Sequence, residues 1–410
     1  MNRRTLIRNA ALLGLSVPAV NALLAACAEA PTSSNPGGGG SDAPLEMASP
    51  DNPVTWPISD DNPPIDDGMS PEAGPLLIYN YADYLGPQVI KSFEEKYGVE
   101  VKVSTFNDTD EMLTKIRTGA VPYDICFPSY DQIARMVTAQ IARPLNHSYL
   151  GNLDNVWDVF QSPWYDGEAR YSVPYSIYTT GIGWRTDQVT DDIAGMDNPY
   201  DILWTPSYAG KVAVIDDWHT CMAQVGLRAG ITDVNTSSAD DLSVIQDNLT
   251  ELASTVKPKV NISMYNDLPA GQIGLCQMWS GDVVNAQYYL PNDTSVDVLQ
   301  YWFPEDGKGL VDNDLMLVLK GGNNPVLAHL FLDHMLDEKN SLKNFGYIGY
   351  QPPQKVLDTD RLVADGYLPE NLATAAVQES WFDTGYRLLE LDVDNDQAWH
   401  RIWQQFKAGA

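Results

Sequence analysis

The chain has 410 residues and is strongly acidic, with 55 Asp and Glu against 25 Lys and Arg and a formal net charge of −30. This balance argues against nucleic acid as a partner, because contacts to phosphates need clustered Lys and Arg. It favours a positively charged ligand, which an acidic field concentrates, although solubility or adaptation to salt would also explain the charge.

The first residues are predicted to be an export signal outside the fold. A twin-arginine start, Arg3-Arg4, precedes an apolar stretch over residues 10–26, and a basic-then-apolar leader of this kind directs export. Residues 24–27, "LAAC", resemble a bacterial lipobox in which Cys27 is lipidated. The alternative is a short membrane anchor, but a proline and an asparagine interrupt a stretch already short for spanning.

Residues 28–75 are predicted to form a flexible tether. The stretches "PTSSNPGGGGSDAP" and "DNPPIDDGMSPEAGP" are rich in Pro, Gly, Ser and Asp, and such segments bury too little apolar surface to offset chain entropy. An export signal over residues 1–27, a lipid on Cys27 and this spacer would hold a globular body outside the cytoplasm. We expect it in the periplasm or at the cell surface, with the lipid anchor as its only membrane contact.

The body that follows exceeds one usual hydrophobic core, so we expect two lobes. Its first part alternates strands and helices: strands at 76–81, 99–106 and 123–129, and helices at 86–98, 108–119 and 131–140. Such runs build a parallel sheet. Because ligands bind beyond the carboxyl ends of parallel strands, the tips after the first and third strands should face one crevice.

A second strand–helix series follows a linking segment at 170–185. Strands are expected within 210–217 and 271–282, each followed by a helix, at 221–230 and 283–290. A late strand at 312–322 leads into an amphipathic helix at 324–338. The alternation of strands and helices predicts an α/β fold.

Motifs for catalysis and metal binding are missing from the sequence. There is no GxSxG elbow, phosphate-binding loop or HExxH helix, so we predict no catalytic residue, no metal and no cofactor. Paired carboxylates could still serve an exported hydrolase of the glycosidase type. Cys126, Cys221 and Cys276 allow at most one disulfide, and two of them lie in apolar runs, which favours simple burial.

Aromatic and acidic residues recur together at the strand tips of both halves. Ring faces attract an ammonium group by about 0.5–2 kcal/mol, and carboxylates bind it through charge-assisted hydrogen bonds. The pattern predicts a site for a long organic cation with an apolar middle. Its members are Tyr79, Tyr81, Asp83, Tyr84, Tyr130, Asp131, Asp217, Trp218, Trp279 and Asp282.

Several separated segments, among them "LLIYNYADYLGPQVIKSFEEKYGVEV", "YDICFPSYDQIARM", "GLCQMWSGD" and "FGYIGYQPP", resemble the spermidine/putrescine-binding proteins of ABC importers. The resemblance implies a two-lobed periplasmic-binding-protein fold with a ligand cleft between the lobes. One lobe would comprise residues 76–182 and 312–356, and the other residues 183–311 and 357–410.

The resemblance also implies which residues contact the ligand. Two positions depart from the family pattern: Thr220 stands where a Glu is common, and Asp312 where a Trp is usual. These departures leave the identity of the polyamine open. The implied ligand-binding residues are Tyr81, Asp83, Tyr84, Ser129, Asp131, Asp217, Trp279, Asp314 and Tyr350.

The resemblance thus implies a monomeric, non-enzymatic substrate-binding lipoprotein of an ABC importer. It would bind a polyamine such as putrescine or spermidine between its lobes and deliver it to a membrane permease and its ATPase. The alternatives are the same fold with another organic cation, or an exported carboxylate-pair hydrolase.

Overall fold

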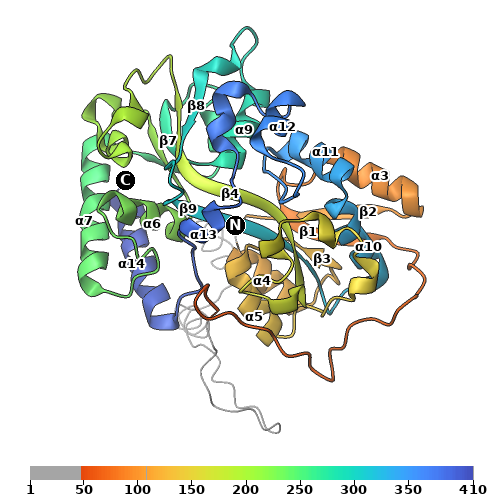
Figure 1. The fold of residues 1–410 in the computed structure, drawn as a ribbon. Helices are drawn as coiled ribbons and strands as arrows, with labels where there is room; N and C mark the ends of the chain where they lie inside the picture. Colours follow the sequence, from red (N-terminus) through yellow and green to blue (C-terminus); the bar gives the residue numbers. More distant parts are fainter. Residues whose placement is uncertain (1–47, 108, 410) are drawn as a thin grey trace, which may run out of the picture. The chain divides into compact units, whose positions relative to one another are not determined.

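The computed structural model describes residues 48–107 and 109–409, and residues 47–410 form one compact unit. The predicted export signal, the lipidation site Cys27 and the first part of the predicted tether lie outside the described residues. Figure 1 shows a twisted sheet that runs through this unit with helices on both sides.

Within the described residues, nine strands form one sheet in the order β2-β1-β3-β9-β4-β7-β5-β6, with β8 paired to β4. The strands are β1 (Leu76–Tyr81), β2 (Val101–Phe106), β3 (Ile125–Cys126), β4 (Ser172–Arg185), β5 (Val212–Ile215), β6 (Lys259–Asn261), β7 (Leu275–Trp279), β8 (Leu299–Trp302) and β9 (Leu310–Val318).

Pairing within the first part is parallel, because β1 lies between β2 and β3 in parallel register. The tips after β1 and β3 therefore lie at the same edge, as the sequence predicted. In the second part, β5 pairs in parallel with both β6 and β7.

Two long antiparallel strands, β4 and β9, connect the two parts of the sheet. The first half of β4 pairs with β9, and its second half pairs with β7 and β8. One buried core extends along this connection, from Ile78 of β1 through Ile177 of β4 to Met278 of β7. Side chains on β4 and β9 can therefore contact residues from both parts of the sheet.

Helices cover both parts of the sheet. Figure 1 shows α6, α7 and α14 beside one end and α3, α10 and α11 beside the other. Gly98 ends α3 in a left-handed conformation, with φ of 70°, as its position predicted. The helices are α3 (Pro87–Tyr97), α4 (Thr109–Thr118), α5 (Ile133–Thr138), α6 (Trp218–Arg228), α7 (Ala239–Val256), α8 (Met264–Asp267), α9 (Ser280–Ala286), α10 (Pro325–Leu336), α11 (Glu338–Ile348), α12 (Thr359–Ala364), α13 (Trp381–Thr384) and α14 (Val393–Gly409).

Residues 48–75, the second part of the predicted tether, pack onto the body. Trp56 is only 5% exposed and donates its indole N–H to the carbonyl of Tyr165 at 2.8 Å. Asn62 donates to the carbonyl of Ala142, and the carboxylate of Glu72 accepts from the first N–H groups of α10. The prediction of a flexible tether is therefore wrong for this part, since a few buried side chains and specific hydrogen bonds offset the chain entropy.

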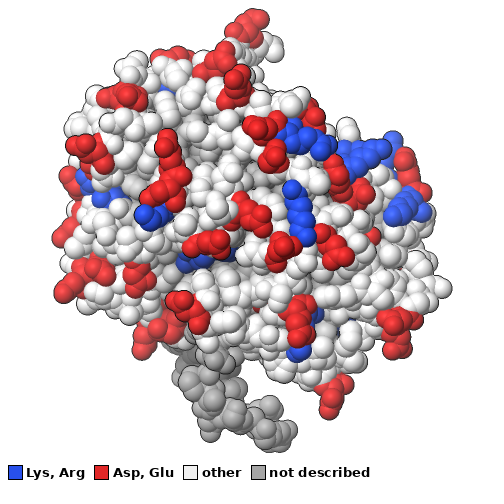
Figure 2. Space-filling model, viewed as in Figure 1, with Lys and Arg blue, Asp and Glu red and all other residues white. Residues whose placement is uncertain are grey.

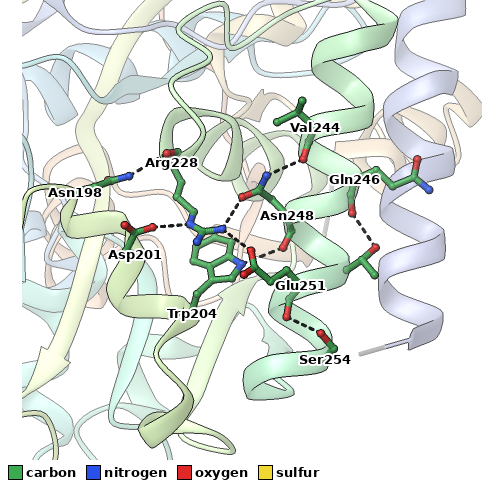
Figure 3. A network of polar contacts seen from close by, with 10 residues as sticks. Asn198, Asp201, Trp204, Arg228, Val244, Gln246, Asn248, Glu251 and Ser254 are labelled. Carbon is green, nitrogen blue, oxygen red and sulfur yellow. Dashed lines mark hydrogen bonds and ion pairs between the residues drawn. The ribbon is translucent and has the colours of Figure 1, made fainter.

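One partly buried guanidinium links the helices of the second part (Figure 3). Arg228, at the end of α6, binds Asp201 at 2.7 Å and Glu251 of α7 at 3.0 Å. Its guanidinium also lies 4.1 Å from the ring centre of Trp204. Asn248 links the same groups, because it accepts from Arg228 and its backbone carbonyl accepts from the indole of Trp204.

Within the described part of the chain, Cys126, Cys221 and Cys276 are buried free thiols, which confirms the burial expected of Cys126 and Cys276 and leaves none of the three in the single disulfide that the sequence allowed. In the same part, no helix has the length and apolar character needed to cross a membrane.

Candidate ligand-binding site

Asp314 of β9 lies at the centre of the predicted site. It is 6% exposed and accepts hydrogen bonds from the hydroxyls of Tyr84 at 2.7 Å and Tyr178 at 3.3 Å. Burial raises the pKa of Asp314 to about 7, against the lowering effect of these hydroxyls. The backbone at Asp314 also bridges to Ser129, which brings the tip after β3 to the same place.

Asp131 and Asp217 form a second acidic part of the site. Asp131 accepts from the hydroxyl of Ser129 at 2.7 Å and from the amide of Gln132 at 2.6 Å. Burial raises the pKa of Asp131, and the charge of Asp217 adds to the rise. The two carboxylates, which come from opposite parts of the sheet, are therefore near each other.

Asp217 also has a local structural role. Its carboxylate accepts from the backbone N–H of Thr220 at 2.9 Å and so caps the start of α6. The capping bond uses Oδ1 of Asp217. Thr220, which departs from the family pattern, thus supports the cap with its backbone.

Asp282, at the start of α9, is a further buried carboxylate. Its Oδ1 accepts from the hydroxyl of Tyr350 at 2.8 Å, while its Oδ2 has no hydrogen-bond partner among the residues that the structure describes. Burial raises the pKa of Asp282 to about 7. We call Asp131, Asp217, Asp282 and Asp314 the inner carboxylates.

Aromatic rings fill the space among the inner carboxylates. Tyr84 and Tyr350 meet edge to face with centroids 5.0 Å apart, and Tyr178 lies 5.6 Å from Tyr350 and 6.4 Å from Trp279. Tyr81 lies 5.9 Å from Tyr84. Burial and next the charge of Asp314 raise the pKa of Tyr81, with smaller contributions from two other inner carboxylates.

Basic side chains form no ion pair with the inner carboxylates. Among residues 48–107 and 109–409, none of the ion pairs involves any of the four, although the charge of Arg135 acts on Asp131 and offsets part of the rise in its pKa. Buried carboxylates usually have a cationic partner, since desolvation of an unpaired charge is costly. The geometry therefore suits a ligand that brings positive charge.

Asp312 differs from the inner carboxylates in its surroundings. It accepts from the hydroxyl of Tyr130 at 3.0 Å, and the nearby Arg387 lowers the pKa that burial raises. The guanidinium of Arg387 lies 4.3 Å from the ring centre of Tyr130 and donates to Asn313 at 2.6 Å. Burial nevertheless prevails and raises the pKa of Asp312 to about 6, so the charge of Arg387 offsets the desolvation of this carboxylate only in part.

A model of the bacterial extracellular solute-binding protein family matches residues 88–370. The chain belongs to this family. The relatives of this solute-binding protein include the putrescine/cadaverine-binding protein of Pseudomonas aeruginosa, which is 28% identical over 346 residues, 81% of this chain and 93% of the relative. The putrescine-binding periplasmic protein PotF of Escherichia coli is 26% identical over 282 residues, 65% of this chain and 75% of PotF.

The fold of this solute-binding protein is also that of a solved relative. The spermidine/putrescine ABC transporter substrate-binding protein PotD of Streptococcus pneumoniae superposes with a TM-score of 0.66, at 24% identity, over 82% of this chain and 98% of that one. The resemblance and the two-lobed α/β fold predicted from sequence are confirmed.

Eight of the nine predicted site residues of this solute-binding protein lie around the inner carboxylates: Tyr81, Tyr84, Ser129, Asp131, Asp217, Trp279, Asp314 and Tyr350. The ninth, Asp83, is exposed. Its charge acts on Tyr265 and Tyr289.

Sequence reasoning left two residues out of the site. Asp282 was a member of the aromatic-plus-acid tip pattern, although it was not among the ligand-binding residues that the resemblance implies. Tyr178 lies on β4, where the alternation of the strand alone does not show that it reaches Asp314. Arg387 had no signal for its bond to Asn313, which is 74 residues away in the chain.

Proposed function

We propose that this solute-binding protein is the lipid-anchored substrate-binding component of an ABC importer, and that it binds a linear polyamine between two lobes. The observation that carries the proposal is a set of two buried carboxylates (Asp282 and Asp314) and two partly buried ones (Asp131 and Asp217), without ion-pair partners among the described residues, among tyrosine and tryptophan rings. The names of the relatives, which bind putrescine, cadaverine or spermidine, support the same ligand class.

In this proposal the inner carboxylates pair with ammonium groups, and the rings of Tyr81, Trp279 and Tyr350 cover the methylene chain between them. Ammonium groups gain from both contacts, since a desolvated cation–π contact contributes about 2 kcal/mol and charge-assisted hydrogen bonds add to it. Ser129 contributes one hydrogen bond. The protein carries out no covalent chemistry.

Delivery of the ligand would depend on closure of the two lobes. In this proposal the lobes have the boundaries that were predicted from the sequence. Ligand contacts to both lobes shift the equilibrium toward the closed form, which a permease and its ATPase would recognise. The protein would act as a monomer, exported and held at the membrane by a lipid on Cys27.

Asp217→Asn tests the site. Asparagine caps a helix about as well as aspartate, so the melting temperature should stay nearly unchanged, whereas alanine would remove the α6 cap. Loss of the charge should weaken putrescine and spermidine binding about tenfold or more in calorimetry.

Asp358→Asn is the matched control, because Asp358 is an exposed cap of α12 that accepts from the N–H of Arg361 at 2.8 Å. Equal affinity of the Asp217→Asn variant and the wild type would remove Asp217 from the site. A thermal-shift screen with putrescine, spermidine, spermine and other organic cations identifies the ligand, because a bound ligand stabilises the fold by mass action. Stabilisation only by a cation that is not a polyamine would refute the polyamine assignment.

A further inference from the structure

One arginine follows an inner carboxylate along the chain but pairs with a different acid. Arg135 belongs to α5, which continues directly from the short helix Tyr130–Gln132 that carries Asp131. Acidic and basic side chains four residues apart on a helix are neighbours and commonly form an ion pair. Arg135 instead binds Glu390, with its Nε 2.6 Å from the carboxylate Oε1.

Glu390 is held beside α5 by contacts other than the ion pair. The backbone N–H of the preceding Leu389 donates to the side chain of Asn235 at 2.7 Å. The hydroxyl of Tyr130 donates to the carbonyl of Leu388. The segment that ends in Glu390 therefore lies along the start of α5, where its carboxylate reaches the guanidinium.

The ion pair is largely shielded from solvent. The side chains of Arg135 and Glu390 are 32% and 16% exposed, so their attraction is screened less than that of a fully exposed pair. Burial works against the charge of Arg135, but the hydrogen bond and the charge of Glu390 raise its pKa, with a smaller contribution from Asp131. The guanidinium thus interacts with both carboxylates, and mainly with Glu390.

Asp131 and Glu390 therefore compete for one guanidinium. Without the carboxylate of Glu390, the arginine side chain would be free to turn toward Asp131, one helical turn earlier. Its charge would then neutralise Asp131 and repel a cation bound nearby, since charges interact strongly where water is partly excluded.

We propose that Glu390 is a positioning residue, which pairs with Arg135 and so keeps Asp131 available to an ammonium group of the ligand. This inference rests on the proposed function. Glu390 acts through Arg135 and does not itself contact the ligand. The ion pair thereby determines how much negative charge the site offers to a cation.

Calorimetry with putrescine and spermidine on the full chain tests this role. Glu390→Gln should weaken the binding of both about three- to tenfold, because the released guanidinium then competes for Asp131. Arg135→Gln should instead strengthen binding about two- to fivefold, because it removes a positive charge beside the site. The double variant should bind within about twofold of the wild type, since neither charge remains.

The opposite signs separate positioning from a merely structural role, in which both single variants would bind more weakly. Asp187→Asn is the matched control, because it also deprives a buried arginine of its carboxylate. Asp187 binds Arg185 at 2.7 Å, at the end of β4 that pairs with β8, and its replacement should leave both affinities unchanged.

Three results would overturn the role of Glu390 and leave polyamine binding intact. These are equal affinity of Glu390→Gln and the wild type, weaker binding by Arg135→Gln, and a double variant as weak as Glu390→Gln. Absence of binding of either polyamine to the wild type would instead refute the proposed function, and the positioning role with it.

Discussion

At the scale of single residues, the feature that matters most is that two buried carboxylates of the site have pKa values near neutrality. Burial raises the pKa of Asp282 and Asp314 to about 7, from a usual value near 4. Both groups are therefore partly protonated near neutral pH, and each must be ionised to pair with an ammonium group.

The pH dependence of binding follows from this. Between about pH 4 and 7 the folded protein holds protons that the unfolded chain has released, so the ligand-free protein should lose stability as pH rises through this window. Polyamine affinity should instead increase with pH. It should be about three- to tenfold lower at pH 6 than at pH 8, because protons compete with the ligand.

Calorimetry in two buffers of different ionisation enthalpy measures the protons that binding releases. Asp314→Asn should reduce both this release and the slope of affinity against pH. A flat affinity over this range, without proton release, would contradict the near-neutral pKa values.

At the scale of elements, the packing of α6 decides where Asp217 lies, because this residue caps the helix. The other end of α6 is held by Arg228, which is 16% exposed at its side chain and binds Asp201, Asn248 and Glu251. The position of Asp217, a proposed ligand-binding residue, thus depends on a polar network at the far end of its helix (Figure 3).

Replacement of Arg228 tests this dependence. Arg228→Ala should lower the free energy of unfolding by about 1–3 kcal/mol, because it removes a ring contact and several charge-assisted hydrogen bonds while its acidic partners remain solvated. Denaturant titration measures the loss. Arg228→Lys should recover only part of it, since a single ammonium group cannot replace the planar fork. A lysine variant as stable as the wild type would show that the fork geometry is unimportant.

At the scale of the whole molecule, the excess of acidic groups lies largely on the surface. Figure 2 shows Asp and Glu scattered over the viewed face rather than gathered in one patch, with fewer Lys and Arg between them. Most of the net charge of −30 is therefore solvated and repels itself, whereas the site depends on a few buried carboxylates.

Added salt should have different effects on the surface charges and on the carboxylates of the site. An increase in potassium chloride from low to about 0.5 M should raise the melting temperature of the ligand-free protein by a few degrees, because it screens surface repulsion. Polyamine affinity should fall over the same range. A lower melting temperature in salt would indicate that surface ion pairs, and not repulsion, dominate.

The sequence by itself determined the local helices and strands and the edge of the sheet at which the candidate site lies. Alternating valines gave β2 and a glycine gave the end of α3, because these signals depend on neighbours within one turn or a few residues. Parallel pairing then placed the tips with Tyr81 and Asp131 at one edge. The tertiary structure alone decided the long-range partners: Arg387 donates to Asn313, Tyr84 donates to Asp314, and Trp56 is buried. Such pairings depend on how distant elements pack, and burial and charge compensation select them only once the chain is folded.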